Sequence, residues 1–294
     1  MDLRHLEFVV AIVDHGGVGR AATALHVAQP SVSASLRRLE RELGVNLFDR
    51  IGRRLVLTDA GATVVDHARR LLAGREHLQA ELADQQGILA GTLRLVSLPT
   101  LATEPLTALV VAFLARHPVV HIEIAEPVDA DDLERRVSDG SSELGLTDLA
   151  LTSRALRRVH LSDQPIVAVL PPATPMPSGQ LTTAQLADLP LITTPPGTST
   201  RTLLDQALRR HHLAANILVE TSHREAIVPL VLAGTGATVL PGPLATDAAQ
   251  RGAVLAQLDP PLRRRIGLVH RPGALSPAAR AFRHTAKNDI DRSR

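Results

Sequence analysis

Three uncharged side chains that can donate and accept hydrogen bonds stand close together in the sequence: Gln29, Ser31 and Ser33. Amides and hydroxyls can pair with the donor and acceptor groups that base pairs present in the major groove of duplex DNA. Arginines follow, and their guanidinium groups bind phosphates; they are Arg37, Arg38, Arg41, Arg50, Arg53 and Arg54. Together the two sets have the chemistry to read bases and to hold a phosphate backbone.

Arginine runs also cover ordinary solvated surfaces, so the elements that position these residues decide the interpretation. Two short apolar patterns with helical spacing surround the first set: Ala21, Ala22 and Leu25 in one, and Val32, Leu36, Leu39 and Leu43 in the other. Only residues 26–29 separate them, which allows a tight turn, and Pro30 suits the first turn of the second helix. The sequence therefore predicts a helix-turn-helix whose second helix begins with the hydrogen-bonding residues.

Further elements are expected on both sides of this motif. A first helix over residues 3–15 has apolar side chains at helical spacing and ends at Gly16 and Gly17. Residues 52–58 are interpreted as a short β excursion, a wing, with Arg53 and Arg54 placed to lie along the phosphates. Around such a core, a surface for duplex DNA is the expected role of the arginines.

The N-terminal part of the chain resembles the winged helix-turn-helix domain of the LysR-type transcriptional regulators. The match covers residues 3–58 and fixes residue types at many positions together. The residues that carry it are LRHLEFVVAIVDHGGVGRAATALHVAQPSVSASLRRLERELGVNLFDR, followed by an arginine of the wing and by Leu57-Thr58. The resemblance implies that bases are contacted by Gln29, Pro30, Ser31 and Ser33, and that Arg53 or Arg54 serves the wing. The expected DNA-binding set also includes Arg37, Arg38 and Arg50. Ala34 departs from the family, where many members carry a polar or basic residue, and this leaves the operator sequence open.

A long helix is expected after this domain, with Thr58 and Asp59 as its N-cap and residues 60–86 in helical conformation. Alternating steps of four and three give the heptad pattern of a coiled coil, along Val64, Ala68, Leu71, Arg75, Leu78 and Leu82. In the family this segment is a dimerising linker helix, and two heads related by a two-fold axis need a pseudo-palindromic site. The alternative is an amphipathic helix packed on its own domain.

Composition bounds the other possibilities. The chain has 294 residues, 45% of them hydrophobic, which suits two or three domains. It has no cysteine, which excludes disulfides, zinc-thiolate sites and thiol nucleophiles. Its aromatic residues are four Phe, too few to stack single-stranded bases, so duplex DNA is favoured. No apolar run suits a signal or membrane-spanning segment, which predicts a cytoplasmic protein without a membrane partner.

From about residue 91, short apolar runs alternate with helical patterns, which predicts an α/β fold with a mainly parallel sheet. The expected strands are residues 93–97, 119–124, 144–147, 166–170, 191–193, 217–220, 237–240, 254–258 and 265–269. The expected helices are residues 104–117, 131–137, 183–187, 201–212, 224–233 and 276–286. This part resembles the effector domain of the same family, which has the fold of periplasmic binding proteins, although residues 142–146 (SELGL) depart from the usual family run.

The expected fold class is therefore α/β, with an N-terminal all-α winged helix-turn-helix and a long linker helix before a two-subdomain effector domain of periplasmic-binding-protein type. The expected boundaries are 1–58 for the DNA-binding domain, 59–90 for the linker and 91–294 for the effector domain. Within the last, subdomain I takes about 91–163 plus 269–294, and subdomain II takes about 164–268.

A ligand is expected between the subdomains, because open α/β sheets bind ligands at the carboxyl ends of their strands. Pro99 and Thr100 follow the first strand of the domain. Residues 196–201 (PGTSTR) end another strand and begin a helix, where hydroxyls, free N–H groups and an arginine would receive an anion; the candidates are Thr198, Ser199, Thr200 and Arg201. Thr198 or Ser199 could equally act as a simple helix cap. Thr147 and His223 are further candidates for the cleft wall.

The leading hypothesis is a transcriptional regulator that binds duplex DNA as a homodimer or homotetramer and responds to a small anionic metabolite. RNA polymerase is a partner that the resemblance implies. The sequence has no Gly-x-Ser-x-Gly, His-Glu-x-x-His or phosphate-loop motif, and no dinucleotide fingerprint after a strand, so neither catalysis nor a cofactor or metal is expected. The alternative is a solute-binding or enzymatic α/β domain whose N-terminal head serves only for assembly.

Overall fold

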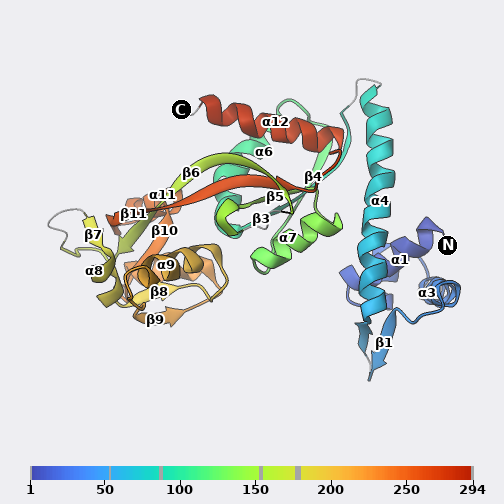
Figure 1. Ribbon diagram of the computed structural model, residues 1–294, viewed down its shortest axis with the longest axis horizontal. Helices are drawn as coiled ribbons and strands as arrows, with labels where there is room; N and C mark the ends of the chain where they lie inside the picture. The colour runs from blue at the N-terminus through green and yellow to red at the C-terminus, as the bar shows by residue number, and fades with distance from the viewer. Residues whose placement is uncertain (1, 53, 86–88, 152–154, 176–179, 293–294) are drawn as a thin grey trace.

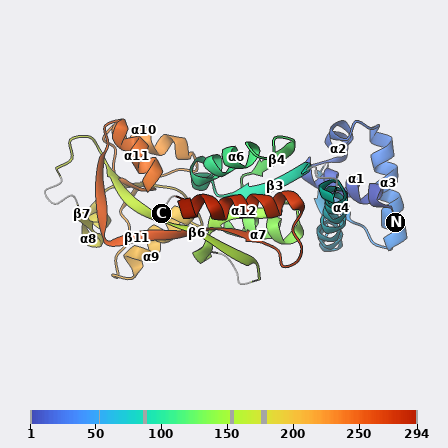
Figure 2. The same ribbon diagram turned by 90° about the horizontal axis from the view of Figure 1, so that it is seen from above.

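The computed structural model describes residues 2–52, 54–85, 89–151, 155–175 and 180–292. The molecule is elongated, with a small helical head at one end and a long helix beside it (Figure 1). Two α/β lobes extend away from that helix, as the view from above shows (Figure 2). The N-terminus lies in the head, whereas the last helix runs along the lobes.

The head consists of three helices and a two-stranded wing. Its elements are α1 (Leu3–Asp14), α2 (Val18–Ala24), α3 (Gln29–Leu43), β1 (Phe48–Ile51) and β2 (Arg54–Leu57). Gly16 and Gly17 have φ angles of +67° and +149°, which favour glycine, and they turn the chain from α1 into α2. The predicted helix-turn-helix is confirmed, and β1 pairs antiparallel with β2 to form the wing.

One apolar core fixes α3 on α1 and α2. Val32, Leu36 and Leu39 of α3 are buried in it, as the helical spacing predicts. Leu43 was expected on the same face but is 38% exposed. It occupies the last turn of α3, beyond the core, and Gly44 then ends the helix with a left-handed φ of +72°.

The linker helix α4 (Asp59–Gln85) begins at the predicted cap, where Thr58 Oγ1 accepts a hydrogen bond of 2.9 Å from the Gly61 N–H. Its first half belongs to the head, because Val65 and Ala68 are buried in the head core. Arg75 forms an ion pair of 2.6 Å with Glu7 of α1. Packing on its own domain, the alternative to a coiled coil, therefore describes this half of the helix.

From Leu71 onward, one face of α4 presents an apolar stripe to solvent. Leu71, Leu78 and Leu82 are 49%, 58% and 52% exposed. Spacings of seven and four residues place the three side chains on one face of the helix. We call these three residues the α4 stripe.

The first lobe is built on three parallel strands, β3 (Gly91–Ser97), β4 (Val120–Ala125) and β5 (Leu144–Asp148), in the order β5-β3-β4. Its helical segments are α5 (Pro99–Leu101), η1 (Ala102–Leu106), α6 (Thr107–Leu114), α7 (Ala130–Asp139), η2 (Leu149–Leu151) and α12 (Pro277–Arg292). Phe113 of α6 meets Phe282 of α12 edge to face, with ring centroids 5.3 Å apart, in the core of this lobe.

Two long antiparallel strands connect the lobes, β6 (Arg157–Leu170) and β11 (Val254–His270) (Figure 1). In the first lobe β11 pairs with β5, and in the second β6 pairs with β10 (Thr238–Pro241). The prediction of a mainly parallel sheet is therefore wrong. The large sheet is mixed, because the chain crosses from one lobe to the other and later returns beside itself.

The strand β11 also replaces two shorter strands that the sequence predicts, at 254–258 and 265–269. Residues 259–261 (DPP) look like an interruption, since proline cannot donate to a sheet. In the structure the pairing with β6 only shifts register between Gln257 and Leu262, and the strand continues.

The second lobe completes the fold. Its remaining elements are β7 (Gln180–Thr182), α8 (Thr183–Asp188), β8 (Leu191–Thr193), α9 (Ser199–Arg209), β9 (Ile217–Glu220), η3 (Arg224–Ala226), α10 (Ile227–Leu232) and α11 (Gly242–Gln250). β8 and β9 form a small parallel sheet of their own. The helix α11 was not predicted, because GPLATDAAQ is short and its few apolar side chains are mostly alanine.

Candidate nucleic-acid interface and effector cleft

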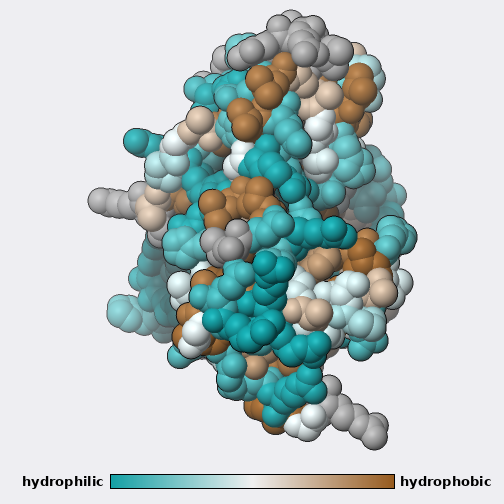
Figure 3. All heavy atoms as spheres, turned by 90° about the vertical axis from the view of Figure 1, so that its right-hand side faces the viewer, coloured by the Kyte–Doolittle hydropathy of each residue, from teal (hydrophilic) through white to brown (hydrophobic). Residues whose placement is uncertain are grey.

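The start of α3 is exposed. Gln29, Pro30 and Ser31 lie at the surface, and Ser33 is half-buried. Ala28, at the N-cap, offers the first turn no side-chain hydrogen bond. Pro30 has no N–H, and the Ser31 N–H donates to the Ala28 carbonyl at 2.9 Å, so the exposed side chains of this turn are what it offers to DNA. Viewed from the side of the head and α4, the surface is largely hydrophilic, with apolar side chains in separate patches (Figure 3).

The predicted arginines are distributed over α3 and the wing. Arg37 is exposed, and Arg38 is also exposed but forms an ion pair of 3.2 Å with Glu42. Arg50 is exposed on β1, and Arg54 begins β2. Arg53 lies outside the described residues. Arg37 and Arg50 are therefore exposed positive charges of the head, as phosphate contacts require.

A cavity of about 380 Å³ lies between the two lobes. Five of the predicted effector residues line it: Pro99, Thr100, Thr198, Ser199 and Thr200. An apolar part of the lining comes from Leu98, Ile227, Val228, Val239, Leu240 and Leu244. The cavity therefore combines hydroxyl groups with an apolar wall, the usual composition of a site for a small organic molecule.

The N-terminus of α9 opens toward this cavity without a side-chain cap. Thr198 occupies the N-cap, but its Oγ1 donates to the Pro195 carbonyl at 3.0 Å and lies 2.5 Å from Thr194 Oγ1. Ser199 is 7% exposed, and its Oγ has no hydrogen-bond partner. Simple capping thus does not account for these hydroxyls.

Three predicted effector residues do not line the cavity. Arg201 is buried and donates to Asp205 at 3.0 Å and Glu220 at 3.1 Å. Burial lowers the pKa of Arg201, but these hydrogen bonds outweigh burial and leave the pKa raised. Its charge is therefore used to join α9 to β9. Thr147 is fully buried on β5, and His223 is exposed beside Glu225 at 3.3 Å.

Sequence reasoning missed Arg264 of β11. This residue is 1% exposed, with Nε donating to Gln164 Oε1 at 2.7 Å and Nη1 donating to Thr100 Oγ1 at 2.8 Å. Burial lowers its pKa to about 10, against the attraction of Asp148. Burial in turn raises the pKa of Asp148. The available signal was an arginine triplet, residues 263–265, inside an otherwise strand-like run.

Two family descriptions match this chain. Residues 3–62 match the bacterial regulatory helix-turn-helix protein, lysR family, and residues 86–290 match the LysR substrate binding domain. The chain belongs to the LysR family. The resemblance drawn from residues 3–58 is confirmed, and the class is that of DNA-binding transcriptional regulators, which are not enzymes.

Characterised LysR-family proteins align over most of this chain. It is 30% identical to the transcriptional activator protein LysR of Escherichia coli K12, over 93% of this chain and 89% of that protein. It is 32% identical to the DNA-binding transcriptional dual regulator OxyR of the same strain, over 93% and 90%. A structure of a cysteine-to-serine mutant of OxyR from Corynebacterium glutamicum with H2O2 bound has a TM-score of 0.64 at 26% identity, over 99% and 93%.

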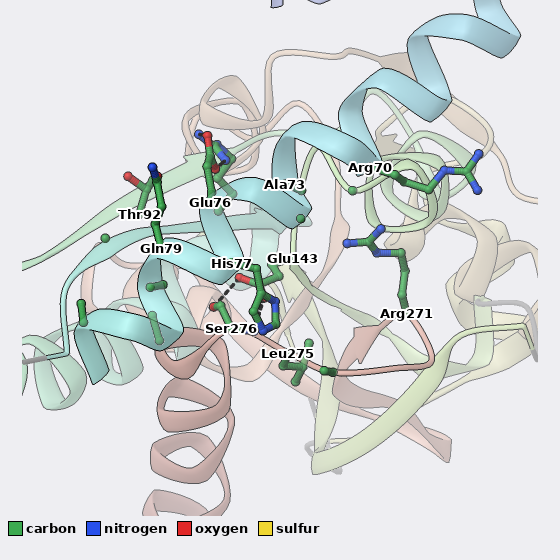
Figure 4. A pocket seen from close by; sticks show the side chains of 18 of the residues that line it. Arg70, Ala73, Glu76, His77, Gln79, Thr92, Glu143, Arg271, Leu275 and Ser276 are labelled. Carbon is green, nitrogen blue, oxygen red and sulfur yellow. Dashed lines mark hydrogen bonds and ion pairs between the residues drawn. The ribbon is translucent and has the colours of Figure 1, made fainter. Parts of the chain in front are cut away.

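In this LysR-family chain a second cavity, of about 590 Å³, separates α4 from the first lobe (Figure 4). Arg94 of β3 reaches across its margin to Glu76 of α4 at 2.5 Å and also contacts Glu123 at 2.9 Å. At the far wall, Glu143 accepts hydrogen bonds from the Ser276 N–H and hydroxyl before α12 (Figure 4). The Arg94–Glu76 ion pair therefore connects the linker helix to the first lobe.

No helix within the described ranges is long and apolar enough to cross a membrane.

Proposed function

We propose that this chain regulates transcription by binding duplex DNA as a dimer or tetramer under the control of a small anionic metabolite, with RNA polymerase as its partner. The observation that carries the proposal is the exposed and uncapped start of α3. Gln29, Pro30 and Ser31 project from a helix whose opposite face is held in the head core. A recognition helix enters the major groove with its N-terminal residues at the base edges.

Selection of bound sequences from a random duplex pool tests this function. The expected result is two half-sites related by two-fold symmetry, with centres separated by about one helical turn or a multiple of it. A footprint on the selected sequence should then cover both half-sites. Equal binding to all duplexes, or tighter binding to a single-stranded pool, would contradict the proposal.

Two sets of exposed apolar residues support assembly of several copies. The first is the α4 stripe. The second includes Val111 of α6, Val119 and Ile124 beside or on β4, and Leu218 of β9, which are 64%, 68%, 49% and 57% exposed. β4 ends the large sheet, so its outer edge has backbone groups that can pair with another chain. One of these two sets of residues is enough to join two chains in a dimer, and the other then allows two dimers to join in a tetramer.

The cavity between the lobes supports a metabolite effector. Threonine hydroxyls and the uncapped α9 N-terminus suit an anionic group, and the apolar wall suits a carbon skeleton. These 294 residues contain no cysteine, so a response based on a thiol is excluded. An effector changes DNA binding only if it favours one arrangement of the lobes and heads over another. A metabolite screen by thermal shift, followed by footprinting with each hit, should find a compound that does both.

A further inference from the structure

Arg264 is a buried cation that lacks an acidic contact. Its guanidinium donates only to the Gln164 amide oxygen and to the Thr100 hydroxyl, and among the described side chains it forms no ion pair. Nη2 is buried without any hydrogen-bond partner. Its pKa of about 10 still leaves the group charged at neutral pH. Burying an unpaired charge is costly, so a protein that retains one needs a compensating interaction.

Two other buried groups with an unpaired atom are related to Arg264 or to the cavity: Asp148 interacts electrostatically with Arg264, and Ser199 lies in the cavity wall. In the described part of the chain, six buried side-chain atoms lack a hydrogen-bond partner. Four of them belong to Arg264, to Thr147 and Asp148 at the carboxyl end of β5, and to Ser199 in the cavity wall. Buried polar groups are normally satisfied, so the unpaired atoms of Arg264 and Ser199 indicate a missing polar partner.

Thr100 connects the buried charge to the cavity. Because its Oγ1 accepts the hydrogen bond from Arg264 Nη1, its own hydroxyl hydrogen must point elsewhere, and Thr100 lines the cavity. A hydroxyl that accepts from a cation is a stronger donor to the next acceptor in the chain. Thr100 therefore presents part of the Arg264 charge to whatever occupies the cavity.

We propose that Arg264, acting through Thr100, makes this cavity selective for a molecule with one carboxylate group and an apolar body. The inference rests on the proposed function of the cavity as the effector site. A single negative charge matches the single guanidinium that lacks an ion pair, whereas a doubly charged phosphate would bring a second charge for which the site has no second unpaired cation. The apolar body would contact residues such as Leu240 and Ile227. Arg264 is thus a positioning residue and not a direct ligand.

Arg201 cannot supply this selectivity, although it stands at the start of α9. Its guanidinium is already bound by Asp205, Glu220 and the Thr194 carbonyl. The cationic residues of the cavity lining, Arg224 and Arg251, are paired with Glu126 at 3.4 Å and Asp247 at 3.8 Å. Arg264 is the buried cation near the cavity that these contacts leave without a carboxylate.

Matched acids and amides test the proposal by isothermal titration calorimetry on the full chain. The probes are 4-methylpentanoate with 4-methylpentanamide and 3-phenylpropanoate with 3-phenylpropanamide, and inorganic phosphate and sulfate are the competing anions. The wild-type chain should prefer each acid over its amide by about tenfold or more, the size expected for one charge at short range in a protein. Arg264→Met should bring the ratio of acid to amide affinity close to one, and Arg264→Lys should restore part of the preference for the acid.

Thr100→Val is the second variant, because it removes the hydroxyl and leaves the buried charge in place. It should also lose the acid preference, and it carries the test if Arg264→Met does not fold. If the ratio of acid to amide affinity is unchanged in Thr100→Val or in a folded Arg264→Met, Arg264 does not determine the selectivity. The cavity would then still stand as an effector site. Tighter binding of phosphate than of any acid would overturn the carboxylate assignment. If neither acids nor amides bind the wild-type chain, the cavity itself fails as an effector site, and the inference fails with it.

Discussion

Gln29 and Arg37 stand on the same helix, yet their loss should affect DNA binding in different ways. Gln29→Ala combined with Ser31→Ala should lower affinity for the selected site, because each good base contact contributes about 1–3 kcal/mol of discrimination. Binding to unrelated duplexes should change little. Competition fluorescence anisotropy with specific and random duplexes measures both, and an equal loss on both would contradict base contacts.

Arg37→Gln should instead weaken binding to every duplex. A phosphate contact carries no sequence information, and its loss should reduce the slope of log K against log salt by about 1. Arg116→Gln is a suitable control, since Arg116 follows α6 in the first lobe, far along the chain from the head. A salt slope equal to that of the wild type would remove Arg37 from the interface.

Asp132 fixes the loop that forms one side of the effector cavity. It is 4% exposed and accepts hydrogen bonds from the Val128 N–H and from Arg136, both at 2.9 Å. Burial alone would raise the pKa of Asp132, but these donors outweigh burial and lower it. Asp132→Asn should therefore reduce the free energy of unfolding by roughly 1–3 kcal/mol at pH 7.

The pH dependence of this effect follows from the direction of the shift. A depressed pKa in the folded state stabilises the protein above the unfolded pKa, near 4, and that stabilisation is lost as pH falls through the folded pKa. In urea denaturation, the difference between wild type and Asp132→Asn should shrink as pH falls from 5 toward 3. A constant difference would show that the charge of Asp132 is not its source.

Residue patterns predicted the exposure of the candidate DNA-binding side chains better than the surroundings of the candidate ligand-binding ones. Gln29 and Ser31 are neighbours on one helix, so helical periodicity alone places them at the surface. Helical or strand periodicity could not show whether Arg201 or Arg264 keeps an unpaired donor near the cavity. Arg201 is bound by Asp205 and by Glu220 of another strand, and Arg264 meets Thr100 across 164 positions of sequence. Such tertiary partners decide which guanidinium keeps an unpaired donor, and the sequence does not contain them.

At the scale of elements, the α4 stripe should control assembly. Leu78→Glu with Leu82→Glu should convert the oligomer to smaller species, because charges replace the apolar face that a second helix would cover. Folding of the single chain should persist, since both side chains are already exposed. Gln79→Glu, which adds charge at an exposed position of the same helix, is the control. Analytical ultracentrifugation that finds the same mass for all three proteins would contradict this prediction.

Elements with local signals were predicted, and those defined by long-range pairing were not. The apolar spacing of α3 and the cap at Thr58 sufficed for the helix-turn-helix and for α4. β6 extends well beyond the predicted 166–170, because its additional residues are mostly polar and gain strand structure by pairing with β11. Hydrophobic pattern cannot report a pairing partner that lies about a hundred residues away.

At the scale of the whole molecule, the junction at Arg94 should transmit the ligand signal. Arg94→Gln should leave ligand affinity and basal DNA affinity nearly unchanged, and reduce the ligand-induced change in DNA affinity. Arg94 and Glu76 are 35% and 41% exposed, so an ion pair here is worth roughly 0.2–1 kcal/mol, or at most about fivefold in coupling.

A double-mutant cycle separates this ion pair from general weakening of the junction. Arg94→Gln, Glu76→Gln and the combined variant should reduce the response to similar extents, because either change breaks the same contact. Arg70→Gln, in the wall of the same cavity, is the control for loss of charge alone. If the combined variant lost the sum of the two single losses in ligand response, the Arg94–Glu76 contact would not be the one that couples the ligand to DNA binding.

The paired strands β6 and β11 have a consequence for how such regulators diversify. The chain enters the second lobe on β6 and leaves it on β11, and the two crossing points are neighbours because Gln164 is paired with Arg264. The whole lobe is therefore an insert with adjacent ends, and exchanging it for the corresponding segment of a relative would require only two neighbouring junctions. Such a graft would replace the cavity lining that the second lobe contributes, including Thr198 and Ser199, and would leave the head unchanged.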